Sequence, residues 1–327
     1  MRIELFILRD KKMSIEALYP ELSPDETGVE GVESQLPEFN FDRAPGVVEV
    51  HGAKSPYTVA IPAGELGSNE LVVYLNGFGA FKKTMRGIRN ATAEQGTASL
   101  STAPIRRSNR SLQHHLLDAT TLHVDHLEAI LDDLPNNKAL RDGTTNGNKL
   151  SFDKVNLAGH SYGGKIAVQY ALEHPDDVSN LILIKPVGQE EPHLTRFVPR
   201  IVPFAKHELL PFLGNHGQDF SITDAGQALK HFAYSPMQTL GEIIACVRSD
   251  HRRDLLELTQ TMGVALITGE KDNLIPAEPI EELAAKLVHH YVRLNTDHLG
   301  PQKEPKLIAR TVINSINVLE SGKVLAA

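Results

Sequence analysis

The sequence predicts an α/β fold in which helices cover both faces of a mostly parallel β-sheet. Short and almost continuously apolar runs, closed by Gly or Pro, alternate along the chain with segments of helical period. The 327 residues are 41% hydrophobic, which is ordinary for a globular protein. A sizeable buried core is therefore expected.

The first half of this pattern follows an acidic, turn-rich stretch, residues 1–45, which we interpret as an N-terminal extension. A long amphipathic helix then comes after several strands, and Pro135 ends it. The first two of those strands are expected to form a hairpin. The predicted strands are 47–53, 57–63, 70–78 and 97–104, and the predicted helix is 111–134.

The second half continues the alternation of strand and helix as far as a terminal helix. Its predicted strands are 154–159, 180–187, 263–270 and 291–296, and its predicted helices are 165–174, 278–290 and 304–320. Residues 188–254 interrupt the alternation and include five of the 11 phenylalanines. We expect most of these rings to form a small core of their own and one or two to line an apolar pocket.

Composition limits the possible partners. The chain has 33 basic and 41 acidic residues and a formal charge of -8, without a long basic run. This balance argues against nucleic acid or an anionic membrane surface as the main partner. Cys246 is the single cysteine, so an intramolecular disulfide and a cysteine-based zinc site are excluded. His123 and His126 lack a strong metal-binding signature, and we expect neither a metal nor a cofactor.

The N-terminus has an apolar run of four residues, 5–8, before Arg9. This run is too short for a signal-peptide core or a membrane-spanning helix. We therefore expect no membrane span and a cytoplasmic location.

The main chemical motif is "GHSYG" at 159–163, which fits the pattern Gly-x-Ser-x-Gly. In this pattern a strand turns sharply into a helix and presents a serine hydroxyl at the turn. The glycines are needed where strand and helix pack closely, and the turn strains the serine backbone. An apolar strand precedes the motif here and a helix follows it, so Ser161 is a candidate nucleophile.

A serine nucleophile needs a base and a group that orients the base, in the chain order Ser, acid, His. Asp272 and His298 each follow a predicted strand and fit this order. Asp297 and Glu270 are rival acids. We favour Asp272 because Asp297 adjoins the histidine and Glu270 is still close to its strand.

Two backbone N–H groups are expected to stabilise the oxyanion. Tyr162 follows the nucleophile and supplies the first. "NGFG" at 76–79 ends an apolar strand, and the N–H of Phe78 is the expected second donor.

Four motifs together resemble the α/β-hydrolase family from about Val47 to Glu320: "NGFG", "GHSYGG", "GEKDNLIP" and "DHLGP". The resemblance implies an eight-stranded, mostly parallel sheet with helices on both faces. It also implies a core made of 46–187 and 255–327, and a mainly helical cap, 188–254, inserted after the sixth strand. Asn76 departs from the histidine that the family often has at that position, and "STAPIRRSNRS" lacks the usual turn after the fourth strand.

The expected function is that of a serine hydrolase cleaving a carboxylic ester, lactone or related acyl substrate with an apolar portion. Within the resemblance, a serine at this turn argues against the alkyl-enzyme mechanism of haloalkane dehalogenases and epoxide hydrolases, which use aspartate there. Acyl transfer and carbon-carbon bond hydrolysis by the same triad stay open. So does a ligand-binding or scaffold protein without catalysis.

Overall fold

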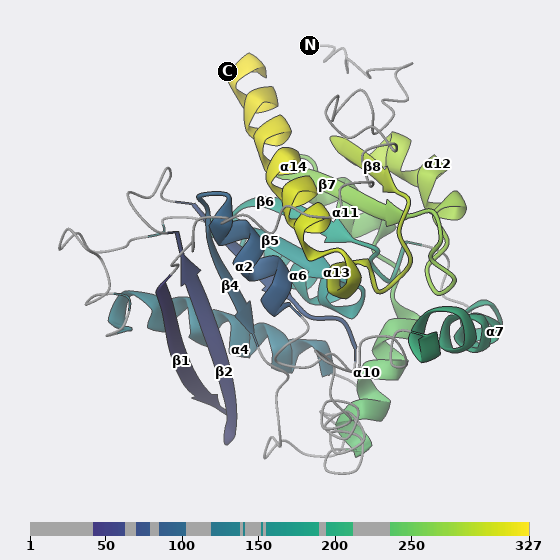
Figure 1. Ribbon diagram of the computed structural model, residues 1–327, viewed down its shortest axis with the longest axis horizontal. Helices are drawn as coiled ribbons and strands as arrows, with labels where there is room; N and C mark the ends of the chain where they lie inside the picture. The colour runs from purple at the N-terminus through teal and green to yellow at the C-terminus, as the bar shows by residue number, and fades with distance from the viewer. Residues whose placement is uncertain are drawn as a thin grey trace, which may run out of the picture. The chain divides into compact units, whose positions relative to one another are not determined.

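The computed structural model describes residues 42–62, 70–78, 85–102, 119–137, 140, 152, 155–189, 194–211 and 236–326 (Figure 1). All of them belong to one compact unit, Asn40–Ala327. Strand β1 (Asp42–Val50) begins within the stretch predicted as the extension, most of which lies outside the described residues. The division into extension, core and cap stays a prediction.

Eight strands form one sheet in the order β1-β2-β4-β3-β5-β6-β7-β8. β1 pairs with β2 and β2 with β4 in antiparallel fashion, whereas all other neighbours are parallel. The expected eight-stranded, mostly parallel sheet is confirmed. Strand bounds after β1 are β2 (Ala53–Ile61), β3 (Leu71–Leu75), β4 (Ala98–Thr102), β5 (Val155–His160), β6 (Val178–Ile184), β7 (Gly263–Gly269) and β8 (His290–Leu294).

Burial explains why the central strands are apolar along their whole length. Every residue of β3, β5 and β7 is buried, as expected for strands that are covered on both faces. β1 and β2 form the predicted hairpin, but its two-residue turn is at His51 (φ 51) and Gly52 (φ 71) rather than between residues 53 and 57 as the predicted strands required. Two consecutive positive φ angles match the twist of an antiparallel hairpin.

Helices pack on both faces of the sheet. α2 (Arg86–Glu94) and α14 (Pro305–Ala326) contact each other, and so do α4 (Ala119–Asp133) and α6 (Tyr162–Glu173). In Figure 1, α2 and α14 lie in front of the strands and α4 lies behind them. The other elements of the core are η2 (Leu134–Asn136), α11 (Arg252–Leu258), α12 (Glu278–Leu287) and α13 (Gly300–Lys303).

Helix α2 was not predicted from the sequence. Its residues include Gly87, Asn90 and Thr92, which are poor helix formers. The helix is nevertheless ordered against the sheet and α14, with Ile88 completely buried. Tertiary packing therefore overrides a weak local preference at this position.

The segment predicted as the cap contains α7 (Leu194–Phe204), a π-helical turn η3 (Ala205–Leu209) and α10 (Pro236–Arg248). Phe197 packs against the main hydrophobic core rather than within a separate one. The ring of Phe204 lies edge-on to that of His298, with centroids 5.6 Å apart. The other three phenylalanines of this segment, Phe212, Phe220 and Phe232, lie outside the described residues.

The strand order determines where a site can form. β3 lies between β4 and β5, so the chain moves to one side of β3 and then to the other. Ligands of open α/β sheets bind beyond the carboxyl ends of the strands at such a switch point. Asn76 follows β3 and Ser161 follows β5, which places both residues at this edge.

Candidate active site

Ser161 occupies a strained turn between β5 and α6. Its backbone angles are φ 54 and ψ -118, a combination that non-glycine residues rarely adopt. Its N–H donates to the carbonyl of Ile184 at 3.0 Å, and its own carbonyl accepts the N–H of Gly164 at 3.0 Å. Main-chain hydrogen bonds on both sides of the residue thus maintain the strained conformation.

The glycines on either side of Ser161 are required by close packing. A Cβ atom on Gly159 would lie 2.4 Å from the carbonyl oxygen of Gly163. A Cβ atom on Gly163 would lie 2.3 Å from the carbonyl oxygen of Leu75 on β3. The structure thus supplies the steric reason for both glycines of the motif.

The loop after β3 lies directly against Ser161. A Cβ atom on Gly77 would be 3.1 Å from that of Ser161. Asn76 Nδ2 donates to the carbonyl of Thr102 at 2.6 Å, which ties the loop to the end of β4. Phe78 is half-buried against the core. The role of its N–H as an oxyanion donor stays a prediction.

Tyr162 begins α6 and is almost completely buried. Its hydroxyl lies 3.3 Å from Thr120 Oγ1, and its ring lies edge-on to His123 at 5.6 Å. Burial raises the pKa of this hydroxyl well above its usual value. The first N–H groups of a helix have no acceptor within the helix, so the N–H of Tyr162 suits an anion at this end of α6. Its role as an oxyanion donor also stays a prediction.

His298 and Asp272 form a hydrogen-bonded pair. Asp272 Oδ2 lies 2.8 Å from His298 Nδ1, and Asp272 Oδ1 accepts the N–H groups of Leu274 at 2.9 Å and Ile275 at 2.7 Å. Because a carboxylate accepts, the neutral ring carries its proton on Nδ1. His298 Nε2 is therefore the nitrogen that can act as a base.

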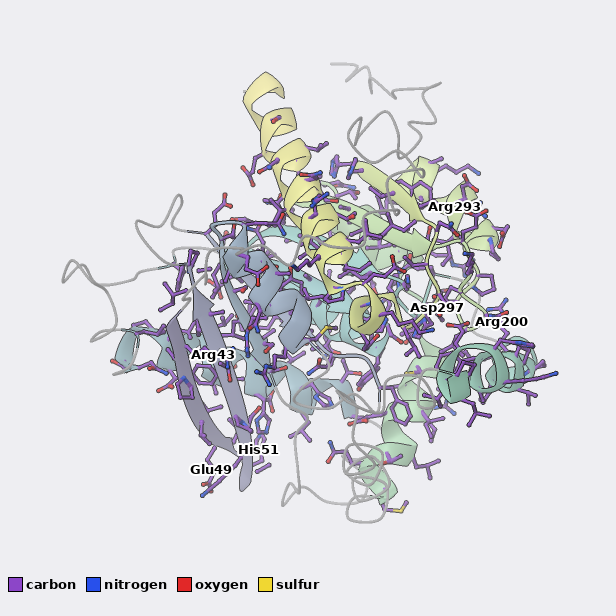
Figure 2. All side chains as sticks on the ribbon, in the orientation of Figure 1. Arg43, Glu49, His51, Arg200, Arg293 and Asp297 are labelled. Carbon is purple, nitrogen blue, oxygen red and sulfur yellow. The ribbon has the colours of Figure 1, made fainter. Side chains whose placement is uncertain are left out.

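The two rival acids have different surroundings. The carboxylate of Asp297 bonds to Lys303 Nζ and accepts the N–H of Leu299 at 3.0 Å. Glu270 is exposed to solvent. Figure 2 labels Asp297 beyond the end of β8, close to the side of the molecule on which α7 lies. The structure thus joins His298 to Asp272, the acid that the sequence favours.

His160 connects the serine turn to the histidine loop. Its Nε2 donates to the carbonyl of His298 at 3.0 Å, and the two rings lie 4.9 Å apart. Burial, followed by the charges of His298 and Lys185, lowers the pKa of His160 well below its usual value. His160 is therefore a neutral, buried donor that joins the residue before Ser161 to the loop of His298.

The site is shielded from water. Ser161 and Asp272 are each 5% exposed and His298 is 4% exposed. Interactions between charges are stronger in such an environment than at the surface. The arrangement suits proton transfer between a hydroxyl and an imidazole that a carboxylate orients.

Two buried charged residues at the site were not predicted from the sequence. Lys185 follows β6, and Glu208 lies in η3. Both contact the loop that carries His298, at 112 and 90 residues' separation along the chain. No motif marks either residue, so sequence patterns offered no signal for them.

Metal ligands are not grouped in the described part of the chain. No three or more His, Cys, Asp or Glu side chains there lie close enough to share a metal ion. His123 and His126 lie three residues apart on α4, and His123 Nε2 is 2.9 Å from Glu242 Oε1 on α10.

Comparisons with known proteins agree with this architecture. A family model described as alpha/beta hydrolase fold matches residues 138–211, which include the serine turn. A hydrolase from Pseudomonas aeruginosa PA01 aligns over 83% of this chain and 98% of its own, with TM-score 0.58 and 18% identity. The enol-lactonase from Burkholderia xenovorans LB400 aligns over 83% of this chain and 100% of its own, with TM-score 0.58 and 16% identity.

The chain has the α/β-hydrolase fold.

Curated relatives match this chain over shorter stretches. Human monoacylglycerol lipase ABHD6 is 25% identical in an alignment 203 positions long, which covers 54% of this chain and 60% of that protein. The 1-acylglycerol-3-phosphate O-acyltransferase ABHD5 of Sus scrofa is 50% identical over 42 residues, 13% of this chain and 12% of that protein. The chain thus matches less than two thirds of the length of either relative.

Proposed function

We propose that this α/β-hydrolase is a serine hydrolase that cleaves a carboxylic ester, lactone or related acyl substrate through an acyl-enzyme. The supporting observations are the strained turn at Ser161, the contact of the preceding residue, His160, with His298, and the 2.8 Å between His298 Nδ1 and the Asp272 carboxylate. A serine hydroxyl is a weak nucleophile near neutral pH and needs such a base. The buried pair of His298 and Asp272 meets that need.

In the first half of the proposed reaction, His298 Nε2 takes the proton of the Ser161 hydroxyl as the oxygen attacks the acyl carbon. Asp272 keeps the ring in the required tautomer and stabilises the imidazolium. The N–H groups of Phe78 and Tyr162 donate to the oxyanion. His298 then protonates the leaving alcohol, and the acyl group remains on Ser161.

In the second half, a water molecule attacks the acyl-enzyme. His298 Nε2 accepts a proton from this water, and the resulting oxyanion again lies against the two N–H groups. Collapse of the intermediate releases the acid, and the proton returns from His298 to Ser161. No group besides those of this chain and water is needed.

We propose that the apolar part of the substrate is a lipid-like acyl chain. The buried site beside the ring of Phe204 favours an apolar group. The names of two of the proteins compared above, a monoacylglycerol lipase and an enol-lactonase, fit ester or lactone chemistry. Among the residues that the structure describes, no helix has the length and apolar composition of a membrane span.

The deciding experiment is labelling with a fluorophosphonate probe, together with hydrolysis of p-nitrophenyl esters of increasing chain length. Ser161→Ala is expected to abolish labelling and to lower kcat/KM by at least about 10⁴-fold. Ser315→Ala is the matched control, because Ser315 is also buried but donates to the carbonyl of Thr311 within α14. Undiminished turnover by Ser161→Ala contradicts the proposal.

Acyl transfer is the second candidate. The 1-acylglycerol-3-phosphate O-acyltransferase among the relatives gives the reason to test it. The same acyl-enzyme would then pass its acyl group to an alcohol instead of water. Product analysis with a lysophospholipid acceptor distinguishes the two activities, and a diketone in the same panel tests carbon-carbon bond hydrolysis. Tight binding of these compounds without turnover or labelling favours a non-catalytic protein.

A further inference from the structure

The peptide bond between Asp297 and His298 lies between two buried side chains of opposite charge. Lys185 Nζ donates to its carbonyl oxygen, and Glu208 Oε2 accepts its N–H at 2.6 Å. Lys185 is 0% exposed and Glu208 is 1% exposed. The orientation of one peptide unit, directly before the ring of His298, is thus fixed from both of its polar ends.

Glu208 also bonds to the loop of the acid. Its second oxygen, Oε1, accepts the N–H of Asn273 at 2.7 Å and the Asn273 side-chain amide at 2.8 Å. Asn273 directly follows Asp272 in the sequence. One carboxylate therefore joins the loops that carry the two members of the hydrogen-bonded pair.

Lys185 has a comparable set of contacts. Its backbone has a positive φ of 46, and its ammonium also donates to Thr296 Oγ1 at 2.8 Å. The negative charges of four carboxylates favour the protonated form of this ammonium, those of Asp272, Asp297, Glu208 and Glu304. Lys185 thus binds Thr296 and the carbonyl of Asp297 at the start of the histidine loop, while Glu208 binds the N–H of His298.

Stability of the fold does not by itself explain the buried charges of Lys185 and Glu208. Burial raises the pKa of Glu208 and lowers the pKa of Lys185 to about 8. Burying charged groups costs free energy even when they are hydrogen-bonded, and apolar replacements are often as stable. A role in fixing geometry explains why such groups occur here beside the site.

We propose that Glu208 and Lys185 are positioning residues that orient the main chain of His298, so that its ring meets Asp272 on one side and Ser161 on the other. This inference rests on the proposed serine hydrolase function. Neither residue touches the reacting atoms in the proposal. Glu208 lies in η3, in the helical segment after β6. Packing of η3 against the loops of Asp272 and His298 therefore helps to orient His298, the proposed base.

Glu208→Gln tests the proposal with almost no change in volume. The glutamate accepts three hydrogen bonds through two oxygens. A glutamine keeps one acceptor oxygen, so its NH₂ group must face an N–H of either Asn273 or His298. We expect kcat for a p-nitrophenyl ester to fall about 30-fold to 100-fold, with KM changed less than about twofold.

Glu320→Gln is the matched control. Its Oε1 accepts a hydrogen bond from the buried Asn180 near the start of β6, at the other end of that strand from Lys185. We expect its kcat to stay within about twofold of the wild-type value. Thermal unfolding of every variant identifies any that fails to fold.

The pH profile separates positioning from general loss of structure. The charged and titratable groups around the His298 ring and its loop include Asp272, His160, Glu208, Lys185 and the ion pair of Asp297 with Lys303. Removing an anion near an imidazole favours its neutral form, and removing a cation favours its charged form. Glu208→Gln is therefore expected to move the acid limb of kcat/KM to lower pH and Lys185→Met to move it to higher pH, each by about half a unit or more.

A third readout does not depend on turnover. The proton between His298 Nδ1 and Asp272 is expected to give a low-field resonance in the wild-type spectrum, and the resonance should shift or broaden in Glu208→Gln. A folded Glu208→Gln variant with wild-type kcat, pH profile and resonance overturns the inference. Lack of hydrolysis and of Ser161 labelling in the wild type refutes the proposed function instead, while the resonance still tests the positioning of His298.

Discussion

The carboxylate of Asp272 uses both of its oxygens. Oδ1 accepts two main-chain N–H groups, from Leu274 and Ile275, and Oδ2 accepts from His298 Nδ1. A group with this set of partners fixes both its own direction and the tautomer of the ring. The geometry therefore makes a specific prediction for the amide analogue.

Asp272→Asn is expected to lower kcat by about 10³-fold to 10⁴-fold near neutral pH. The amide oxygen replaces Oδ1 at the two N–H groups, so the NH₂ group faces His298 Nδ1. The ring then has to accept at Nδ1 and carries its proton on Nε2, where it cannot take the proton of Ser161. Steady-state kinetics on an activated ester measure the loss.

Asp297→Asn is the comparison for the rival acid. Its side chain contacts Lys303 and the N–H of Leu299 rather than a ring nitrogen of His298. We expect its kcat to fall less than about tenfold. The reverse order of the two variants would assign the acid to Asp297.

Sequence patterns predicted some residues of the site but not others. Ser161, Asp272 and His298 each follow an apolar strand, so their shared edge could be predicted from strand order, although their catalytic roles stay predictions. Glu208 could not be found in this way, because it lies in a helical turn at no fixed distance from any motif. Its contact with His298 exists only in the folded chain.

At the scale of elements, the turn from β5 into α6 depends on main-chain contact. β5, the start of α6 and the end of β3 approach so closely that no side chain fits at Gly159 or Gly163. The strands around this turn were predictable because they are apolar throughout. Helix α2 was not, since its packing against α14 rather than its local sequence determines it.

Gly159→Ala is expected to lower the free energy of unfolding by about 1–3 kcal/mol, because its Cβ would meet the rigid carbonyl of Gly163. Gly322→Ala is the control within α14, where a Cβ would meet nothing within 4 Å. Alanine at an open helical position is expected to raise stability by about 0.5–1 kcal/mol. Urea unfolding of both variants checks the opposite signs, and equal effects would contradict this account of the turn.

At the scale of the whole molecule, one sheet edge receives loops from distant parts of the chain. The residues after β3, β5, β6, β7 and β8 all contribute to the site, together with η3. Such a site forms only when these five strands lie side by side in the sheet. Conditions that weaken the fold are therefore expected to abolish activity together with global structure.

Mild acid is one such condition. Burial is the main cause that lowers the pKa of His160 and of His251, so both stay neutral in the folded protein where the unfolded chain, with an ordinary value of 6.5, takes up protons. Below that pH the unfolded state binds more protons, and each histidine lowers stability by about 1.4 kcal/mol per pH unit. Glu208, whose pKa is raised by burial, acts in the opposite direction, since its folded form binds the extra proton.

His290, whose pKa burial also lowers, acts in the same direction, so stability is expected to fall as the pH drops from about 6.5 to about 5, with Glu208 offsetting part of the loss. Urea unfolding across this range measures the slope. His251→Asn removes one of the three histidines, the one whose Nδ1 lies 2.9 Å from Asp254 Oδ2, and is expected to reduce the slope by about a third or more. Stability that stays constant or rises toward pH 5 would mean that these buried imidazoles are protonated in the folded protein.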